Sequence, residues 1–320
     1  MIVDFQTHFT PRQIVERQAE PGKAVTVIYR HGIPVYSLHS RLYAVEERLR
    51  AMDEAGIDTS VLSSAGGWDA PLEDCRLVND TLGRLAKEHP GRFVGLAHTP
   101  PLGGESALGE LRRGVQDLGL RGAAITAHIG DVTLEDARLD PFYATVAELD
   151  VPIFIHPALL PLGHEHLADF DLARSVGREF GLTLAVMRLI KGGVLRRFPG
   201  LRFVFAHLGG SIAGLLGRIR SFEDRSFWGT GGAETGPSFA DQLALLRFDT
   251  AGFAGAINPT KAALLELPAE HILFGSDYPQ EIRTGGELKA FIERLRALPL
   301  EKAQIDGILG GNAAKVLKLG

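Results

Sequence analysis

The sequence predicts an α/β chain folded as a (β/α)₈ TIM barrel, because short apolar segments alternate with helix-like segments from end to end. The apolar segments are rich in Val, Ile and Phe, which is typical of parallel strands covered by helices on both faces. Eight segments have this character: Ile2–Phe5, Thr59–Leu62, Phe93–Ala97, Ala123–Thr126, Pro152–Ile155, Arg202–Ala206, Arg247–Thr250 and His271–Gly275. Eight such units favour a closed barrel, and a doubly wound open sheet is the alternative.

Helix signals lie between these strands. The segment Tyr43–Ala55 has apolar residues at helical spacing and is followed by Gly56, a natural C-terminal cap. Leu167–Phe198 predicts one or two helices with a break near Gly181, and Ser211–Arg220 predicts a helix directly after the sixth strand. The order strand, helix, strand is therefore kept along the chain.

One stretch departs from this alternation. Residues 22–40 predict a small β-hairpin with its turn at His31-Gly32, inserted after the first strand and placed over the barrel mouth. The chain has 320 residues, and barrels of this class run about 250 residues or more with insertions. We therefore expect one domain over residues 1–320.

The composition excludes several classes of protein. The chain is 45% hydrophobic and 23% charged with a formal net charge of -5, which argues against a nucleic-acid or anionic-membrane surface. The single Cys75 cannot form an internal disulfide. The first residues lack the basic and apolar regions of a signal peptide, and no apolar run is long enough to span a membrane. We expect a cytoplasmic location by default.

Polar residues follow the predicted strands where each strand ends. The first strand leads into Gln6-Thr7-His8, and His128, His156, His207 and Asp277 follow the fourth, fifth, sixth and eighth strands. In a (β/α)₈ barrel the C-terminal strand ends converge on the active site. Imidazoles and a carboxylate in one pocket match the ligands of catalytic zinc or a similar divalent ion.

Local context separates the roles of these residues. His156 ends a wholly apolar run, where an imidazole is costly unless it is used. His207 precedes Gly209-Gly210, which leave room for substrate, so we expect an acid/base role for it more than ligation. Trp68, after the second strand, is a candidate substrate contact, as is His128, although each has an ordinary structural interpretation in the core or in a loop.

At this point the chain resembles the amidohydrolase-related (amidohydrolase 2) family, which includes aminocarboxymuconate semialdehyde decarboxylase and γ-resorcylate decarboxylase. The resemblance covers nearly the whole chain, and the order and spacing of its blocks are specific. The blocks are Asp4-Phe5-Gln6-Thr7-His8, residues 48–58, Ile155-His156-Pro157, residues 206–211, residues 275–279 and residues 310–315.

The resemblance implies a metal-dependent, non-oxidative decarboxylase of an aromatic or unsaturated carboxylic acid. The divalent metal would be zinc first and manganese second, held by Gln6, His8, His156 and Asp277. His207 would be the catalytic acid/base, assisted by Asp277. Arg218 would reach the substrate of a neighbouring subunit, which implies a homodimer.

Two positions depart from the family pattern. Gln6 stands where the family usually has His or Glu, and its neutral amide is a weaker metal donor. Ile33 precedes Pro34-Val35-Tyr36 where the semialdehyde decarboxylase has an arginine, so a different carboxylate is expected as substrate. A metal-dependent hydrolase of a lactone, ester or amide, a hydratase, and a binding protein on a decayed barrel are the alternatives.

Overall fold

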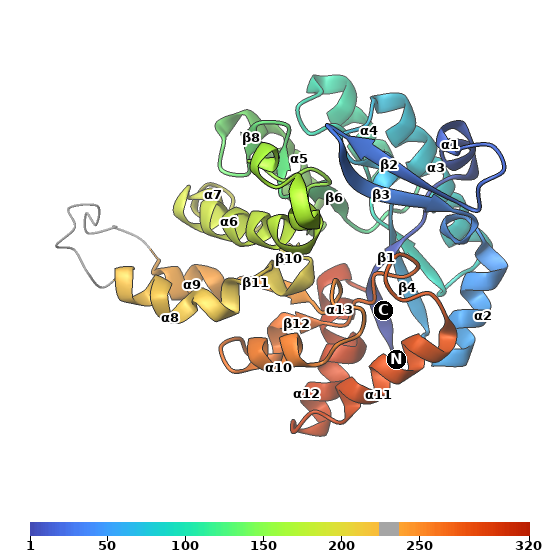
Figure 1. Ribbon diagram of the computed structural model, residues 1–320. Helices are drawn as coiled ribbons and strands as arrows, with labels where there is room; N and C mark the ends of the chain where they lie inside the picture. The colour runs from blue at the N-terminus through green and yellow to red at the C-terminus, as the bar shows by residue number, and fades with distance from the viewer. Residues whose placement is uncertain (224–236) are drawn as a thin grey trace.

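A ring of eight parallel strands lies at the centre of the computed structural model, which describes residues 1–223 and 237–320 (Figure 1). Within these residues the ring consists of β1 (Val3–His8), β4 (Thr59–Ser63), β5 (Phe93–Gly95), β6 (Ala123–Thr126), β9 (Ile153–His156), β10 (Phe203–Phe205), β11 (Leu246–Asp249) and β12 (Ile272–Leu273). Adjacent strands pair in the orders β1-β4-β5 and β6-β9-β10-β11-β12. Single bridges from Ala97 to Ala123 and from Thr7 to Tyr278 close the ring. The predicted barrel is confirmed.

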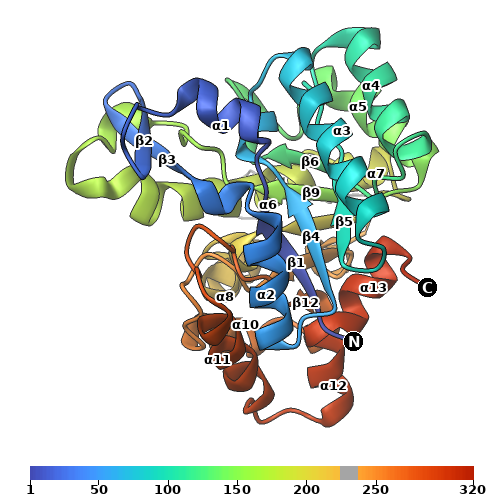
Figure 2. The ribbon, with the colours of Figure 1, turned by 90° about the vertical axis from the view of Figure 1, so that its right-hand side faces the viewer.

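The helices lie outside the strands in both views (Figures 1 and 2). Those that the structure describes are α1 (Arg12–Gln18), α2 (Val45–Ala55), α3 (Leu72–Glu88), α4 (Gly104–Gln116), α5 (Asp140–Leu149), α6 (Arg178–Lys191), α7 (Val194–Arg197), α8 (Ile212–Glu223), α9 (Phe239–Leu243), α10 (Asn258–Leu264), α11 (Gly285–Arg296), α12 (Lys302–Asp306) and α13 (Asn312–Leu317). Apolar residues of the helices and of the strands form one hydrophobic core.

Two glycines show where helix boundaries follow the sequence and where they do not. Gly56 ends α2 in the left-handed conformation, with φ of 73°, as its position predicts. The expected break near Gly181 is wrong, because α6 runs through it and ends at Lys191, with Gly192 as its C-terminal cap. A glycine inside a helix costs only about 1 kcal/mol, and burial of Leu182, Val186 and Leu189 offsets this cost.

A β-hairpin follows α1 at the place that the sequence predicts. Strands β2 (Val25–Arg30) and β3 (Ile33–His39) pair antiparallel, and the turn residues His31 and Gly32 both have positive φ. The buried Val35 packs against Trp68 and Leu159, which follow β4 and β9. The hairpin is thereby attached to the C-terminal end of the barrel. A second, shorter hairpin is formed by β7 (His128–Ile129) and β8 (Val132–Thr133).

A buried arginine fixes the end of β1. Arg48 of α2 is 1% exposed, and its Nη2 donates a hydrogen bond to the backbone oxygen of His8. Its guanidinium also lies 4.8 Å from the ring centroid of Tyr278. Burial lowers the pKa of Arg48 to about 10, so the group stays charged at neutral pH. Helix α2 therefore holds together two segments that carry site residues.

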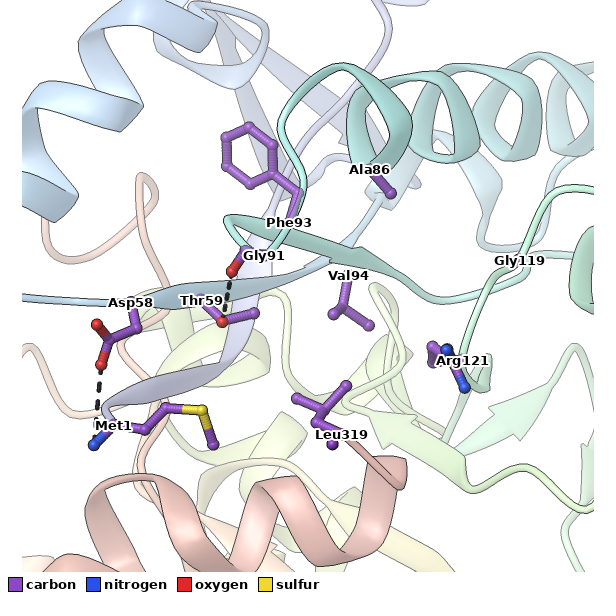
Figure 3. Close-up of a pocket in the computed structure, with 11 residues that line it drawn as sticks. Met1, Asp58, Thr59, Ala86, Gly91, Phe93, Val94, Gly119, Arg121 and Leu319 are labelled. Carbon is purple, nitrogen blue, oxygen red and sulfur yellow. Dashed lines mark hydrogen bonds and ion pairs between the residues drawn. The ribbon is translucent and has the colours of Figure 1, made fainter.

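A cavity of about 620 Å³ opens at the opposite end of the barrel, where the strands begin (Figure 3). Met1, Asp58, Phe93 and Arg121 are among its lining residues, and no imidazole is among those that the structure describes there. In TIM barrels this end serves stability, and the active site lies at the other end.

None of the described helices has the length and apolarity needed to cross a membrane.

Candidate active site

The C-terminal strand ends bring four predicted residues into one cavity of about 390 Å³. His8 ends β1, His156 ends β9, His207 follows β10 and Asp277 follows β12, and all four line this cavity. Val35, Tyr36 and Ser37 of the hairpin contribute to its wall. The sequence prediction that these distant residues meet in space is therefore confirmed.

Three of these residues form a group suited to a metal ion. The ligand atoms of His8, His156 and Asp277 all lie within 4.8 Å of one another. His8 Nε2 and Asp277 Oδ1 are 2.6 Å apart, yet none of the described residues forms a hydrogen bond of suitable geometry with Oδ1. His156 Nδ1 lies 2.9 Å from the backbone oxygen of Pro157. The lone pair of its other ring nitrogen, Nε2, can therefore bind a metal ion. Two imidazole nitrogens and a carboxylate oxygen fit a divalent cation.

The electrostatics of the group agree with metal binding. Burial, followed by the neighbouring His8 and His207, lowers the pKa of His156 well below its usual value. Burial alone would raise the pKa of Asp277, but the adjacent His8 and His207 outweigh it and the pKa lies below its usual value. At neutral pH the group thus offers a neutral imidazole and a carboxylate, the protonation states that a metal requires.

His207 has surroundings of a different kind. Its Nδ1 lies 2.8 Å from Glu179 Oε1, and its ring centroid is 5.8 Å from that of His156. Burial works against protonation, but the Glu179 carboxylate and then Asp277 outweigh it and raise the pKa of His207 to about 9. The imidazole therefore holds a proton at neutral pH. This is the property of a catalytic acid.

The backbone at His207 and Asp277 supports their positions. Both residues have positive φ, of 52° and 59°, a conformation that costs energy in residues other than glycine and that clusters at functional sites. Gly252 faces the His207 ring so closely that a Cβ there would lie 2.3 Å from Cγ of the imidazole. Any larger residue at 252 would displace His207.

Gln6 lies beside His207 and is 0% exposed. With its amide nitrogen facing Asp249, at 2.9 and 2.7 Å from the two carboxylate oxygens, its oxygen faces His207 Nε2 at 3.3 Å. In this orientation the Gln6 amide nitrogen donates to the Asp249 carboxylate, and the Gln6 amide oxygen accepts from His207 Nε2. The amide is therefore engaged by a carboxylate and an imidazole, and the role of Gln6 as a metal ligand stays a prediction.

Asp249, which ends β11, is the carboxylate that accepts from the Gln6 amide. It is 0% exposed and accepts hydrogen bonds from the backbone nitrogens of His207, at 3.1 Å, and Ala251, at 3.0 Å. Burial raises the pKa of Asp249 to about 7. The strand-end rule applied to the seventh strand would have found this residue. Glu179, in the first turn of α6, carries no comparable signal in the sequence.

The predicted substrate contacts fall in three different places. Trp68 lines the cavity, where its ring stacks on His156 with centroids 3.8 Å apart. His128 lines a neighbouring cavity of about 490 Å³, and its Nδ1 lies 2.7 Å from the backbone oxygen of Gly130. Arg218 lies exposed on α8, 4.9 Å from the ring of Phe222, outside the cavity of its own chain. The structure therefore brings only Trp68 to the four central residues.

Comparison with known proteins places this geometry in a family. The family model described as amidohydrolase matches residues 3–319. The chain belongs to the amidohydrolase family. Over 235 residues this amidohydrolase is 29% identical to 2-amino-3-carboxymuconate-6-semialdehyde decarboxylase of Dictyostelium discoideum. That alignment spans 68% of the chain and 65% of the relative, just under two thirds of the relative's own length.

Two further relatives are similar over most of their length. The amidohydrolase is 29% identical over 276 residues to γ-resorcylate decarboxylase of Rhodococcus jostii, which covers 76% of this chain and 80% of that protein. A crystal structure of dihydroxybenzoic acid decarboxylase from Polaromonas sp. JS666, with bound manganese and the inhibitor 2-nitroresorcinol, is 26% identical. Its TM-score is 0.78, and the match covers 99% of this chain and 97% of that one.

Proposed function

We propose that the chain is a metal-dependent carboxy-lyase that removes CO₂, without oxidation, from an aromatic or unsaturated carboxylic acid. The observation that carries the proposal is the pairing of two sites in one cavity: the His8–His156–Asp277 group, and beside it His207 with its proton held by Glu179. Decarboxylation needs a centre that orients the acid and an acid that protonates the carbon. The decarboxylase relatives support this choice of reaction.

We propose that His8, His156 and Asp277 would hold a divalent cation. The sequence also predicts the Gln6 amide oxygen as a donor, and the Gln6→Leu variant described below tests that prediction. Imidazole and carboxylate donors suit zinc, our first expectation, and also manganese, which the Polaromonas relative contains. When bound, the cation supplies a positive centre that orients an oxygen of the substrate and draws electron density from the reacting group.

The residues of the chain supply the proton. The bond between the carbon skeleton and the carboxylate breaks, CO₂ leaves, and the electron pair stays on the carbon. His207 delivers its proton to that carbon and regains one from water. Glu179 keeps the imidazole oriented through Nδ1, so the proton that His207 delivers is the one on Nε2. In the free protein this nitrogen faces the Gln6 amide oxygen at 3.3 Å, and the proton passes from that contact to the carbon. Gly252 leaves the space that this orientation needs.

The walls of the cavity favour a flat ligand. The Trp68 ring is stacked on His156, and the ring of Phe253 lies 6.2 Å from that of His207. Both aromatic residues line the cavity, so it offers apolar surface to a planar acid whose polar groups face the histidines. A homodimer, in which Arg218 reaches the neighbouring subunit's cavity, and a cytoplasmic location stay predictions.

A product assay tests the proposal. Protein stripped of metal and then supplied with zinc or manganese is incubated with hydroxybenzoates and muconate-like acids, and released CO₂ is measured. We expect metal-dependent CO₂ release from at least one acid. Opening of a lactone or ester, or addition of water to the acid, with no CO₂ released, would replace this function by a hydrolase or a hydratase.

Replacing Gln6 by leucine tests its place in the site. The substitution removes the contacts with Asp249 and His207 and leaves the three metal-binding side chains. We expect kcat to fall about tenfold, the size of effect known for partners that position a site, and bound metal to remain near one equivalent. Metal content and kcat are measured on the same preparation. Loss of the metal would instead place Gln6 among the ligands.

A further inference from the structure

Arg178, the first residue of α6, lines the cavity and has no role in the mechanism above. Its Nη2 donates hydrogen bonds to the backbone oxygens of Val35 and Leu159, the latter at 2.9 Å. These two contacts come from β3 of the hairpin and from the segment after β9. The guanidinium is therefore fixed between two walls of the cavity.

One donor of the guanidinium, Nε, has no hydrogen-bond partner among the described residues. This nitrogen is buried, and no carboxylate of the described residues lies within ion-pair distance of the group. Burial lowers the pKa of Arg178 to about 10, so it remains charged at neutral pH. The carboxylates of Asp277 and Glu179 act on this charge, but neither forms an ion pair with it. A half-buried cation with an unused donor and no carboxylate in direct contact is costly, and an anionic ligand in the cavity would reduce that cost.

The other two arginines of the cavity differ in this respect. Arg174 forms two hydrogen bonds of 2.7 Å with the carboxylate of Asp171, which neutralises it. Arg283 is exposed, so water already solvates its charge. Of these three arginines, Arg178 alone is partly buried with a donor, Nε, that has no partner among the described residues. Arginine is the side chain best suited to bind a carboxylate.

The cavity thus has two places for acidic groups. The His8–His156–Asp277 group offers one through its cation, and Arg178 offers the other. With a volume of about 390 Å³, the cavity is near the small end of the roughly 300–1,000 Å³ known for ligand pockets. A compact planar acid with two carboxylates fits this arrangement better than a monocarboxylic acid does.

We propose that Arg178 binds a carboxylate that stays with the product, so that the substrate of this chain is a compact dicarboxylic acid. The proposal rests on the proposed function, because the metal group is taken to hold the other end of the substrate. A cation on the retained carboxylate fixes the molecule without opposing departure of CO₂. Arg178 is thus a residue that determines specificity.

The test measures binding and needs no turnover. The chain has two tryptophans, Trp68 in the cavity and Trp228 outside the described residues. In a Trp228→Phe background, the fluorescence of Trp68 reports occupancy of the cavity directly. Benzene-1,3-dicarboxylate and benzoate are titrated into zinc-loaded protein, and their dissociation constants are compared. We expect the dicarboxylate to bind at least about tenfold tighter, the contribution of a hydrogen bond to a charged group.

Variants then assign that preference. Arg178→Gln should weaken dicarboxylate binding at least about tenfold and leave benzoate binding nearly unchanged, and Arg178→Lys should restore part of the difference. Arg283→Gln, which alters the exposed arginine of the same cavity, is the matched control and should change neither constant.

The outcomes separate this proposal from the proposed function. Equal binding of both acids by the parent protein, or equal weakening of both in Arg178→Gln and Arg178→Lys, would overturn the role of Arg178. Absence of CO₂ release from every acid, with the binding preference intact, would instead overturn the decarboxylase and leave Arg178 as the anchor of a dicarboxylate.

Discussion

Replacing His207 by asparagine lowers kcat by about 10²–10⁴-fold, because the variant has no group that can protonate the carbon. This factor is the usual contribution of a well-placed acid or base and equals about 3–5 kcal/mol in the barrier. KM changes little, since the substrate is held elsewhere in the cavity. The measurement is steady-state CO₂ release with zinc or manganese in excess.

The controls for this variant separate chemistry from binding. His207 is not a member of the His8–His156–Asp277 group, so metal content should stay near one equivalent. His166→Asn changes an exposed loop histidine and should leave kcat unchanged. If His207→Asn retained near-normal turnover, the proton would have to come from another group, and the assignment of His207 as the acid would be wrong.

Replacing His8 by alanine removes both the metal and the activity. The substitution deletes one of three clustered donors and the imidazole that lies 2.6 Å from Asp277. Loss of an outer-shell partner of a metal site already costs roughly 10–100-fold in affinity or activity, and loss of a ligand costs more. Elemental analysis after dialysis should find about one equivalent in the parent protein and almost none in the variant.

Two comparisons complete the metal experiment. His207→Asn alters an imidazole of the same cavity that does not belong to the His8–His156–Asp277 group. This variant should keep its metal although it is inactive. High metal concentration should restore part of the activity of His8→Ala, because His156 and Asp277 remain. A His8→Ala variant that keeps a full equivalent of metal would show that these three residues are not the site.

The strand-end rule explains why most of the site could be predicted. The C-terminal ends of barrel strands must converge, so His8, His156, His207 and Asp277 could be assigned to one cavity from position alone. The same rule covers Asp249, which the sequence prediction left out: the predicted strand Arg247–Thr250 runs one residue past Asp249, whereas β11 ends at it. The fold followed from the strand and helix patterns. The prediction for Leu167–Phe198 was wrong in two respects, because residues 169–177 form 3-10 and π segments and α6 continues through Gly181.

Tertiary packing explains what the sequence could not predict. His128 stands only two residues beyond β6, but the chain turns there into β7 and β8 and carries the imidazole to Gly130. Glu179 reaches His207 because of how α6 packs beside the end of β10, a contact across 28 positions of the chain. Arg178 depends in the same way on carbonyl groups of the hairpin and of the loop after β9.

The most direct test of the central claim is the isotopic composition of the product. The metal-loaded protein is incubated with a reactive acid in deuterated water enriched in heavy oxygen, and the product is analysed by mass spectrometry. The account predicts loss of CO₂ and one deuterium bound to the carbon that carried it, with no heavy oxygen incorporated. A product that keeps its carboxylate and gains heavy oxygen would contradict the account and identify a hydrolase or a hydratase.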